Sequence, residues 1–210
     1  MPKKIQIPPN PKNFIESLRR YGYDASTSVA DLVDNSITAN ADNIWIDCYP
    51  VEKDHWLSIT DDGDGMTPKE LIKAMTLGAK DPKKEREGGD LGRFGLGLKT
   101  ASFSQCRKLT VITKKSNSKP AAACWDLDLI EKDNAWTLIE LENSDLKKLP
   151  NNLRGIDSHG TQVLWQNIDT IEGETAEETS DDLDERLTGI RQDLSLIFHR
   201  FINTSGKKNK

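Results

Sequence analysis

The sequence predicts a single α/β domain whose sheet is antiparallel in large part. Its 210 residues, 35% hydrophobic and 30% charged, are enough for one compact domain with a sizeable core. Apolar residues recur at helical spacing in several segments, and short runs with strand-like patterns lie between them. Three of these runs, within residues 108–141, follow one another closely enough to form successive hairpins, which favours antiparallel pairing.

Composition limits the classes of function. The 29 Lys and Arg residues are outnumbered by 34 Asp and Glu residues, so no overall basic field can hold nucleic acid, and any DNA contact would be local or lie elsewhere. Cys48, Cys106 and Cys124 are far apart and form no C-x-x-C pair, which indicates free, buried thiols in a reducing compartment. No apolar run has transmembrane length, so we expect a cytoplasmic protein without membrane association.

Helical patterns begin after an N-terminal arm, residues 1–12, at whose end Pro11 can start the first helix. A second helix should follow Ser26–Ser28, whose hydroxyls can cap it, and its apolar stripe should face a sheet. Thr67–Glu70 is a capping box with proline at the first helical position, and it predicts a third helix.

The remaining patterns predict strands and a C-terminal helix. Strands are expected at residues 43–49, 55–60, 108–114, 121–130, 135–141 and 161–166. Residues 167–185 carry nine acidic side chains with little to bury and should form a solvated loop. An amphipathic helix is expected at about residues 182–202, followed by a basic tail, 204–210. The folded domain should therefore span about residues 13–203.

A glycine-rich stretch, residues 90–100, follows a charged segment and runs into a predicted helix. Glycine lets the backbone approach a ligand closely, and a helix start offers unpaired N–H groups to an anion, so the stretch predicts a phosphate cradle. A plain turn is the alternative. The charged segment before it, residues 78–91, has adjacent glycines and no apolar periodicity, and is typical of a mobile lid.

Two further stretches complete a candidate nucleotide site. Asp61, at a predicted strand end beside Gly63 and Gly65, can accept a hydrogen bond from the amino group of adenine, although an ordinary Asp-Gly turn has the same pattern. Asn35 can ligate magnesium together with triphosphate oxygens, and its alternative is a polar residue on a helix face. Asp31, one turn earlier, can orient or deprotonate a water, and its alternative is a solvated carboxylate.

Read in order, these motifs resemble the successive boxes of the GHKL ATPases, the superfamily of DNA gyrase B, large heat-shock chaperones, histidine kinases and MutL. The motifs are Asp31–Ser36, Asp61–Met66, Gly92–Gly97 and Gly160-Thr161. The similarity is greatest to MORC-type and MutL-type ATPases, and it covers nearly the whole chain. It implies a two-layer sandwich, with helices on one face of a mixed, largely antiparallel sheet.

The resemblance also implies roles for individual residues. Asn35 would coordinate magnesium, Asp61 would bind the adenine amine, and Thr161 would support Asp61 through a hydroxyl or a water. Lys80 and Lys99 would add positive charge near the phosphates, and residues 78–91 would be the ATP lid. The other residues implied in nucleotide binding are Asp34, Ala39, Gly63, Gly65, Met66, Leu77, Gly92, Arg93, Phe94, Gly95, Leu96, Gly97 and Thr100.

The function so implied is a magnesium-dependent ATPase domain in which ATP closes the lid and drives homodimerisation. Its process would be linked to DNA, such as prokaryotic defence, with DNA bound by regions outside this domain. The family most often has glutamate where Asp31 stands, so we expect slow hydrolysis. We also expect an isolated ATPase domain, without the transducer domain whose lysine reaches the γ-phosphate in related proteins.

Two alternatives share these motifs. One is an ATP-sensing dimerisation module with little hydrolysis, and the other is a chaperone-like ATPase. A histidine kinase is disfavoured, because His55, His159 and His199 are isolated and no phosphoacceptor helix is evident.

Overall fold

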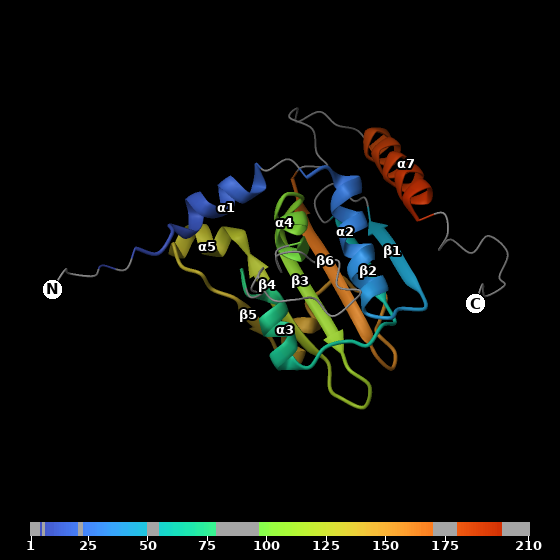
Figure 1. Ribbon diagram of the computed structural model, residues 1–210, viewed down its shortest axis with the longest axis horizontal. Helices are drawn as coiled ribbons and strands as arrows, with labels where there is room; N and C mark the ends of the chain where they lie inside the picture. Colours follow the sequence, from blue (N-terminus) through green and yellow to red (C-terminus); the bar gives the residue numbers. More distant parts are fainter. Residues whose placement is uncertain are drawn as a thin grey trace, which may run out of the picture.

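A six-stranded sheet organises the described part of the chain, with strand order β1-β2-β6-β3-β4-β5 (Figure 1). The computed structural model describes residues 5, 7–20, 23–49, 55–78, 97–169 and 180–198, with the backbone alone for residues 180–187 and 191. The strands are β1 (Ile44–Tyr49), β2 (Trp56–Asp61), β3 (Cys106–Lys114), β4 (Ala121–Asp126), β5 (Ile139–Leu141) and β6 (Gly160–Ile168).

All five strand pairings are antiparallel, so the described sheet has none of the parallel pairing that a mixed sheet would require. The last strand, β6, lies in the middle, between β2 and β3. This insertion sets Thr161 opposite both Asp61 of β2 and Thr113 of β3. Residues 100 positions apart in the chain are thereby brought together at one end of the sheet.

Helices α2, α3 and α4 cover one face of the sheet (Figure 1). The helices are α1 (Pro11–Arg19), α2 (Ala25–Thr38), α3 (Pro68–Met75), α4 (Gly97–Phe103), α5 (Leu127–Asp133), α6 (Asn143–Leu146) and α7 (Ser180–Ile197). The core lies between the two layers, where Leu32, Met75 and Phe103 from the helices meet Ile59 and Trp165 from the strands. Burial of one such side chain stabilises the folded protein by about 1.5–3 kcal/mol. The predicted two-layer sandwich is confirmed.

Local capping explains where the helices begin. The predicted capping box of α3 is present, since Thr67 and Glu70 bond each other's backbone N–H groups. The predicted start of α2 is wrong: Asp24 is the N-cap and accepts from Thr27 N, so Ser26–Ser28 form the first turn of the helix. An aspartate immediately ahead of the hydroxyl residues is an equally good cap and starts the helix earlier.

The predicted strand at residues 121–130 is too long. The Asp126 carboxylate accepts from the backbone N–H groups of Asp128 and Leu129, which caps α5 and ends β4. Asn134 then ends α5 in the left-handed conformation, at φ 47°. The next strand is shorter than predicted, at Ile139–Leu141, and α6 was not predicted.

The predicted acidic loop, residues 167–185, is too long at both ends. Strand β6 continues to Ile168, and α7 begins at Ser180, two residues before its predicted start. The predicted helix end at residue 202 and the tail 204–210 lie outside the described residues, and the described helix ends at Ile197. In the described ranges no helix is long and apolar enough to cross a membrane. Cys106 and Cys124 are free and buried, as predicted, whereas Cys48 is only partly buried.

Candidate nucleotide-binding site

A cavity of about 380 Å³ lies between the helical layer and the sheet. Eight of the predicted residues line it: Asn35, Ala39, Asp61, Gly65, Met66, Gly97, Lys99 and Thr161. The apolar side chains of Leu32, Val111 and Val163 contribute to its walls. A larger groove of about 760 Å³ lies between the start of α2 and α7, and none of the predicted site residues lines it. The smaller, mostly apolar cavity therefore fits a heterocyclic base better.

Asp61 supplies the buried carboxylate of this cavity, and the residue is 6% exposed. Its Oδ1 accepts from the backbone N–H of Gly63 at 2.9 Å and of Thr161 at 3.1 Å, and its Oδ2 accepts from Ser36 Oγ at 2.9 Å. Burial raises the pKa of Asp61 above its ordinary value, although these three hydrogen bonds oppose the shift. A carboxylate oxygen has two lone pairs, so Oδ2 can accept one more hydrogen bond.

Glycines shape the loop after Asp61 by allowing close backbone packing. A Cβ at Gly63 would lie 2.5 Å from the carbonyl oxygen of Ala39, at the end of α2. Gly65 has φ +64°, and a Cβ there would lie 2.0 Å from the carbonyl oxygen of Lys114. The loop is fixed further by His159, whose Nδ1 lies 2.7 Å from the carbonyl oxygen of Gly63. These glycines are thus required by the packing of the protein itself.

Thr161 supports Asp61 differently from the prediction. Its backbone N–H makes the bond to Asp61, while its hydroxyl pairs with Thr113 Oγ1 at 3.0 Å. Thr113 Oγ1 also accepts from Met66 N at 2.8 Å and bonds the carbonyl oxygen of Gly160 at 3.0 Å. Thr113 therefore joins three segments of the site.

The supporting roles of Ser36 and Thr113 were not predicted from the sequence. Ser36 follows Asn35 directly, so knowing which face of α2 meets the sheet would have been enough to find it. No local pattern marks Thr113, because its role depends on the pairing of β3 with β6.

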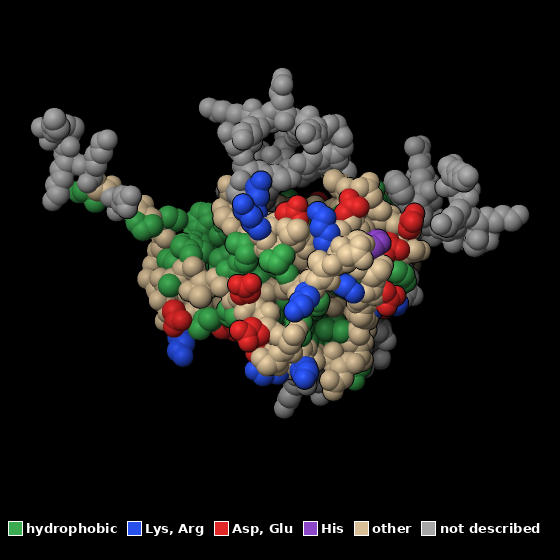
Figure 2. All heavy atoms as spheres, turned by 90° about the horizontal axis from the view of Figure 1, so that it is seen from below, with side chains coloured by type: hydrophobic (Ala, Val, Ile, Leu, Met, Phe, Trp, Pro, Cys, Tyr) green, Lys and Arg blue, Asp and Glu red, His purple; other side chains and the backbone are tan. Residues whose placement is uncertain are grey.

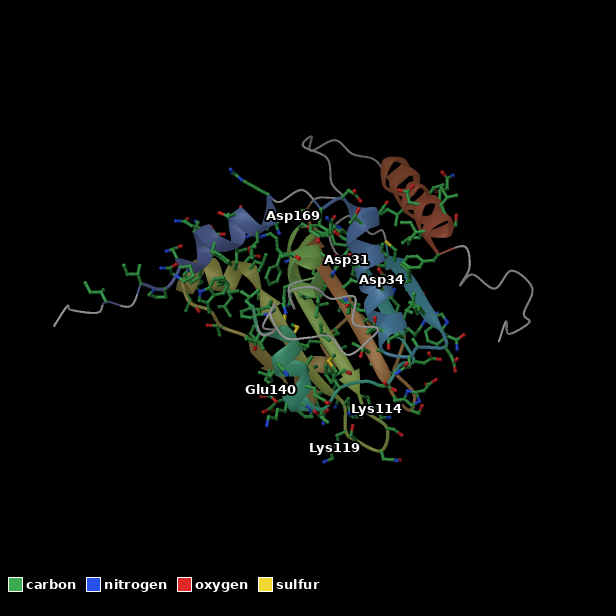
Figure 3. The ribbon with its side chains drawn as sticks, viewed as in Figure 1. Asp31, Asp34, Lys114, Lys119, Glu140 and Asp169 are labelled. Carbon is green, nitrogen blue, oxygen red and sulfur yellow. The ribbon has the colours of Figure 1, made fainter. Side chains whose placement is uncertain are left out.

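The polar face of α2 carries Asp31, Asp34 and Asn35, and Figure 3 shows both aspartates on this helix. Burial and then the charge of Asp34 raise the pKa of Asp31, while a hydrogen bond from Tyr23 opposes the shift. Burial likewise raises the pKa of Asp34. A Cβ at Gly97 would lie 3.8 Å from Asp31 Oδ2. The Asp31 carboxylate therefore faces the start of α4, the helix that follows the glycine-rich stretch.

Lys99 of α4 is almost fully buried, at 2% exposed. Its ammonium donates to the carbonyl oxygens of Ala74 at 2.6 Å and Thr76 at 3.1 Å, at the end of α3. These bonds satisfy carbonyls that the helix itself leaves unpaired. Lys99 thus ties α3 to α4, and its expected role beside the phosphates stays a prediction.

Not every predicted residue reaches the cavity. Asp31, Asp34, Gly63, Leu77 and Thr100 are described but do not line it, and Leu77 packs against the core. Lys80, the residues Gly92, Arg93, Phe94, Gly95 and Leu96, and all of the predicted lid except Gly78 lie outside the described residues. The phosphate cradle and the lid therefore remain predictions.

The described residues offer few ligands to a metal ion. Within the described residues no three His, Cys, Asp or Glu side chains are grouped to hold a metal ion. Among the described residues that line the cavity, Asn35 is the one with a side-chain amide, and Gly97 at the start of α4 also lines it. Magnesium accepts such a sparse protein site when phosphate oxygens and waters complete its shell. The donor set present fits magnesium bound as a nucleotide complex.

Comparison with known proteins agrees with this geometry. Residues 23–161 match the family described as histidine kinase-, DNA gyrase B-, and HSP90-like ATPase. The chain is 34% identical over 115 residues to the ATPase morc-1 of Caenorhabditis elegans, covering 54% of this chain and 13% of that protein. It is 32% identical over 94 residues to the mouse MORC family CW-type zinc finger protein 3, covering 44% of this chain and 10% of that protein.

A chaperone is also among the relatives. The chain is 32% identical over 165 residues to the chaperone protein HtpG of Clostridium perfringens, covering 74% of this chain and 24% of that protein. The chain thus spans a quarter or less of these three relatives. The predicted likeness to MORC proteins is confirmed, and the likeness to MutL stays a prediction. Because the family model covers well over half of the 210 residues, the chain belongs to the histidine kinase-, DNA gyrase B- and HSP90-like ATPases, the GHKL superfamily.

Proposed function

We propose that this domain binds ATP with magnesium and hydrolyses it slowly. The observation that carries the proposal is Asp61, a buried carboxylate in a mostly apolar cavity. It accepts three hydrogen bonds from the protein, and its Oδ2 can accept one more. A carboxylate accepts from the amino group of adenine but repels the carbonyl oxygen that guanine has at the same position. The cavity therefore favours an adenine nucleotide.

The remaining residues follow from placing the base against Asp61. Asn35 lies between the cavity and the charged face of α2, where its amide oxygen would hold the magnesium ion. The ion, when bound, neutralises charge on the phosphate oxygens. Asp31 faces the start of α4 and would orient a water toward the γ-phosphate, accepting its proton. Its raised pKa moves it toward the range in which a carboxylate works as a base.

A second candidate is an ATP-dependent switch with little hydrolysis. Asp31 is one methylene shorter than glutamate. This limits its reach toward a water, and a misplacement near 1 Å can cost about a hundredfold in rate. Binding of ATP would be unaffected, because Asp61 and the cavity do not depend on Asp31.

Partners are part of the proposal. ATP-dependent homodimerisation and a link to DNA rest on the likeness to MORC proteins, and a link to prokaryotic defence rests on the sequence resemblance alone. On the face shown in Figure 2, Lys and Arg side chains are interspersed with Asp and Glu side chains among the described residues. Such a face suits DNA poorly, so contact with DNA would use other parts of the protein.

Phosphate release and ATP affinity, measured on the same preparations, test this function. We expect Asp31→Ala to abolish phosphate release while ATP affinity stays within about twofold, and Asp31→Glu to hydrolyse at least as fast as wild type. Asp133→Ala, at an exposed aspartate on α5, is the matched control and should behave as wild type. Absence of ATP binding in the wild-type domain would contradict the proposal, and binding without phosphate release would select the switch.

A further inference from the structure

His159 joins the last strand of the sheet to the loop that follows Asp61. It lies directly before Gly160, where β6 begins, and its Nδ1 lies 2.7 Å from the carbonyl oxygen of Gly63. A carbonyl oxygen can only accept a hydrogen bond, so Nδ1 must carry a hydrogen and donate it. The imidazole ring therefore bonds the loop from the side of β6.

The Asp61 carboxylate bridges the same two segments. Its Oδ1 accepts from Gly63 N in the loop at 2.9 Å and from Thr161 N in β6 at 3.1 Å. The two backbones also meet directly, since a Cβ at Gly160 would lie 2.0 Å from the carbonyl oxygen of Asp61. An N–H donor weakens as a hydrogen-bond partner beyond about 3.2 Å. Oδ1 therefore keeps both bonds only while the loop and β6 hold their present separation.

The other side of the loop is held by the end of α2. The backbone N–H of Asp64 donates to the carbonyl oxygen of Ala39 at 2.8 Å, and Asn40 Nδ2 donates to Asp64 Oδ2 at 2.8 Å. These bonds anchor the loop to α2 without involving β6. The bond from His159 supplies an anchor on the opposite side, so that the loop is held between the helix and the strand.

We propose that His159 is a positioning residue for the recognition of adenine and that it acts through Asp61. By fixing Gly63 relative to β6, the ring keeps both N–H donors on Oδ1, so the carboxylate does not rotate. Oδ2 then stays directed toward Ser36, which donates to it at 2.9 Å, and toward the base. A rotated carboxylate would lose the alignment that a hydrogen bond from the amino group of adenine needs.

His159 itself is not among the residues that line the cavity. Its effect on a nucleotide must therefore pass through the loop and Asp61, and it should act on the choice of base more than on the rest of the nucleotide. The inference rests on the proposed binding of adenine by Asp61, and it adds a residue outside the cavity that determines the specificity.

Nucleotide selectivity separates this role from a purely structural one. We expect His159→Leu to bind ATP about tenfold less tightly than wild type, while its affinity for inosine triphosphate, which lacks the 6-amino group, changes by less than about threefold. In His159→Asn the amide nitrogen lies near the position of Nδ1 and can donate to Gly63, so this variant should keep the preference for ATP. His55→Leu is the matched control, because His55 bonds the carbonyl oxygen of Ile168 at the other end of β6.

The outcomes distinguish the two proposals. If wild type binds ATP and inosine triphosphate equally, the proposed contact of Asp61 with adenine fails and this inference fails with it. If wild type discriminates but His159→Leu keeps the wild-type ratio of the two affinities, only the positioning role is overturned. In the Asp61→Asn background, His159→Leu should change that ratio by no more than about twofold. A larger change would show that His159 does not act through Asp61 and would overturn the positioning role.

The hydrogen bond itself can be tested in the wild-type protein. The domain is labelled with ¹⁵N at histidine and measured above the pH range in which the rings titrate, with each ring assigned by its loss in His159→Asn or His55→Leu. His159 should carry its proton on Nδ1. His55 is the internal control and should carry its proton on Nε2, since that atom lies 2.8 Å from the carbonyl oxygen of Ile168. A His159 ring protonated on Nε2 alone would show that Gly63 receives no hydrogen bond from it, and would overturn the inference.

Discussion

Ser36 and Asp61 share a buried hydrogen bond: Ser36 Oγ donates to Asp61 Oδ2 at 2.9 Å, across 25 positions of the chain. Ser36 stands next to Asn35 on α2, and Asp61 ends β2. One turn of α2 therefore supports the carboxylate at the base end of the cavity and also presents the amide proposed for magnesium. In the proposed complex, this one helix would set the distance between the adenine base and the magnesium ion.

The loop after Asp61 should tolerate no side chain at Gly63. An alanine Cβ there would meet the carbonyl oxygen of Ala39 at 2.5 Å, and backbone at the end of a packed helix cannot move away cheaply. We expect Gly63→Ala to destabilise the domain by about 1–3 kcal/mol in urea unfolding. Gly155→Ala is the control, since no atom lies within 4 Å of its added Cβ. If Gly63→Ala and Gly155→Ala lose the same unfolding free energy, the close packing of Gly63 against Ala39 is contradicted.

The ammonium of Lys99 should matter for stability. Lys99→Met removes two charge-assisted bonds to the carbonyl oxygens of Ala74 and Thr76 and leaves the end of α3 uncapped. We expect a loss of roughly 2 kcal/mol in the free energy of unfolding without nucleotide. Lys119→Met, at an exposed lysine in the turn between β3 and β4, should change stability by less than about 0.5 kcal/mol. Unchanged stability of Lys99→Met with weakened ATP binding would instead assign Lys99 to the phosphates.

Asn35 should carry the magnesium dependence of binding. Asn35 lines the cavity, and an amide oxygen is a neutral ligand that magnesium accepts beside phosphate oxygens. In calorimetry, magnesium should raise the ATP affinity of wild type by about tenfold or more, and Asn35→Ala should lose that gain. The control Asn13→Ala, on the exposed side of α1, should keep it. If magnesium raises the ATP affinity of Asn35→Ala as much as that of wild type, Asn35 is not the magnesium ligand.

The stability of the domain should depend on the ionisation of Asp61. Because burial raises its pKa, the folded protein keeps this proton at pH values where the unfolded chain has lost it. Stability is therefore lost as the pH rises from the ordinary aspartate range through the raised pKa. Asp61→Asn cannot ionise, and its amide oxygen can still accept from Gly63 and Thr161. In urea unfolding the variant should be the more stable protein at neutral pH, and the difference should vanish in acid.

The control for this pH dependence is Asp133→Asn, at an exposed aspartate. It should track wild type throughout the range. An Asp61→Asn protein less stable than wild type at neutral pH would show that the ionised carboxylate is stabilised by its three hydrogen bonds more than it is penalised by burial.

Much of the fold was predictable because its signals are local. The capping box of Thr67 and Glu70, the strand-like run of β1 and the apolar stripe of α2 each depend on residues within one element. The failures have local causes too. Asp126 caps α5 inside a run that otherwise has a strand pattern, and Asp24 starts α2 before the hydroxyl residues that were expected to cap it.

The candidate site was predictable only in part. Asp61 and Asn35 belong to motifs, so their positions along the chain indicated a shared ligand. The support of Asp61 by Thr161 could not be derived in detail, because it uses a backbone N–H brought close by the insertion of β6 between β2 and β3. Thr113 lies outside the motifs, and its contacts exist only in the folded protein.

The binding of ATP and of inosine triphosphate to wild type and to Asp61→Asn tests the central claim most directly, because the two nucleotides differ in the 6-amino group that Asp61 is proposed to bind. Calorimetry should show wild type binding ATP at least about tenfold more tightly than inosine triphosphate. Asp61→Asn, which offers an amide donor beside Ser36, should lose about tenfold or more in ATP affinity and no longer discriminate against the 6-oxo base. Equal ATP affinity in the two proteins would contradict the account.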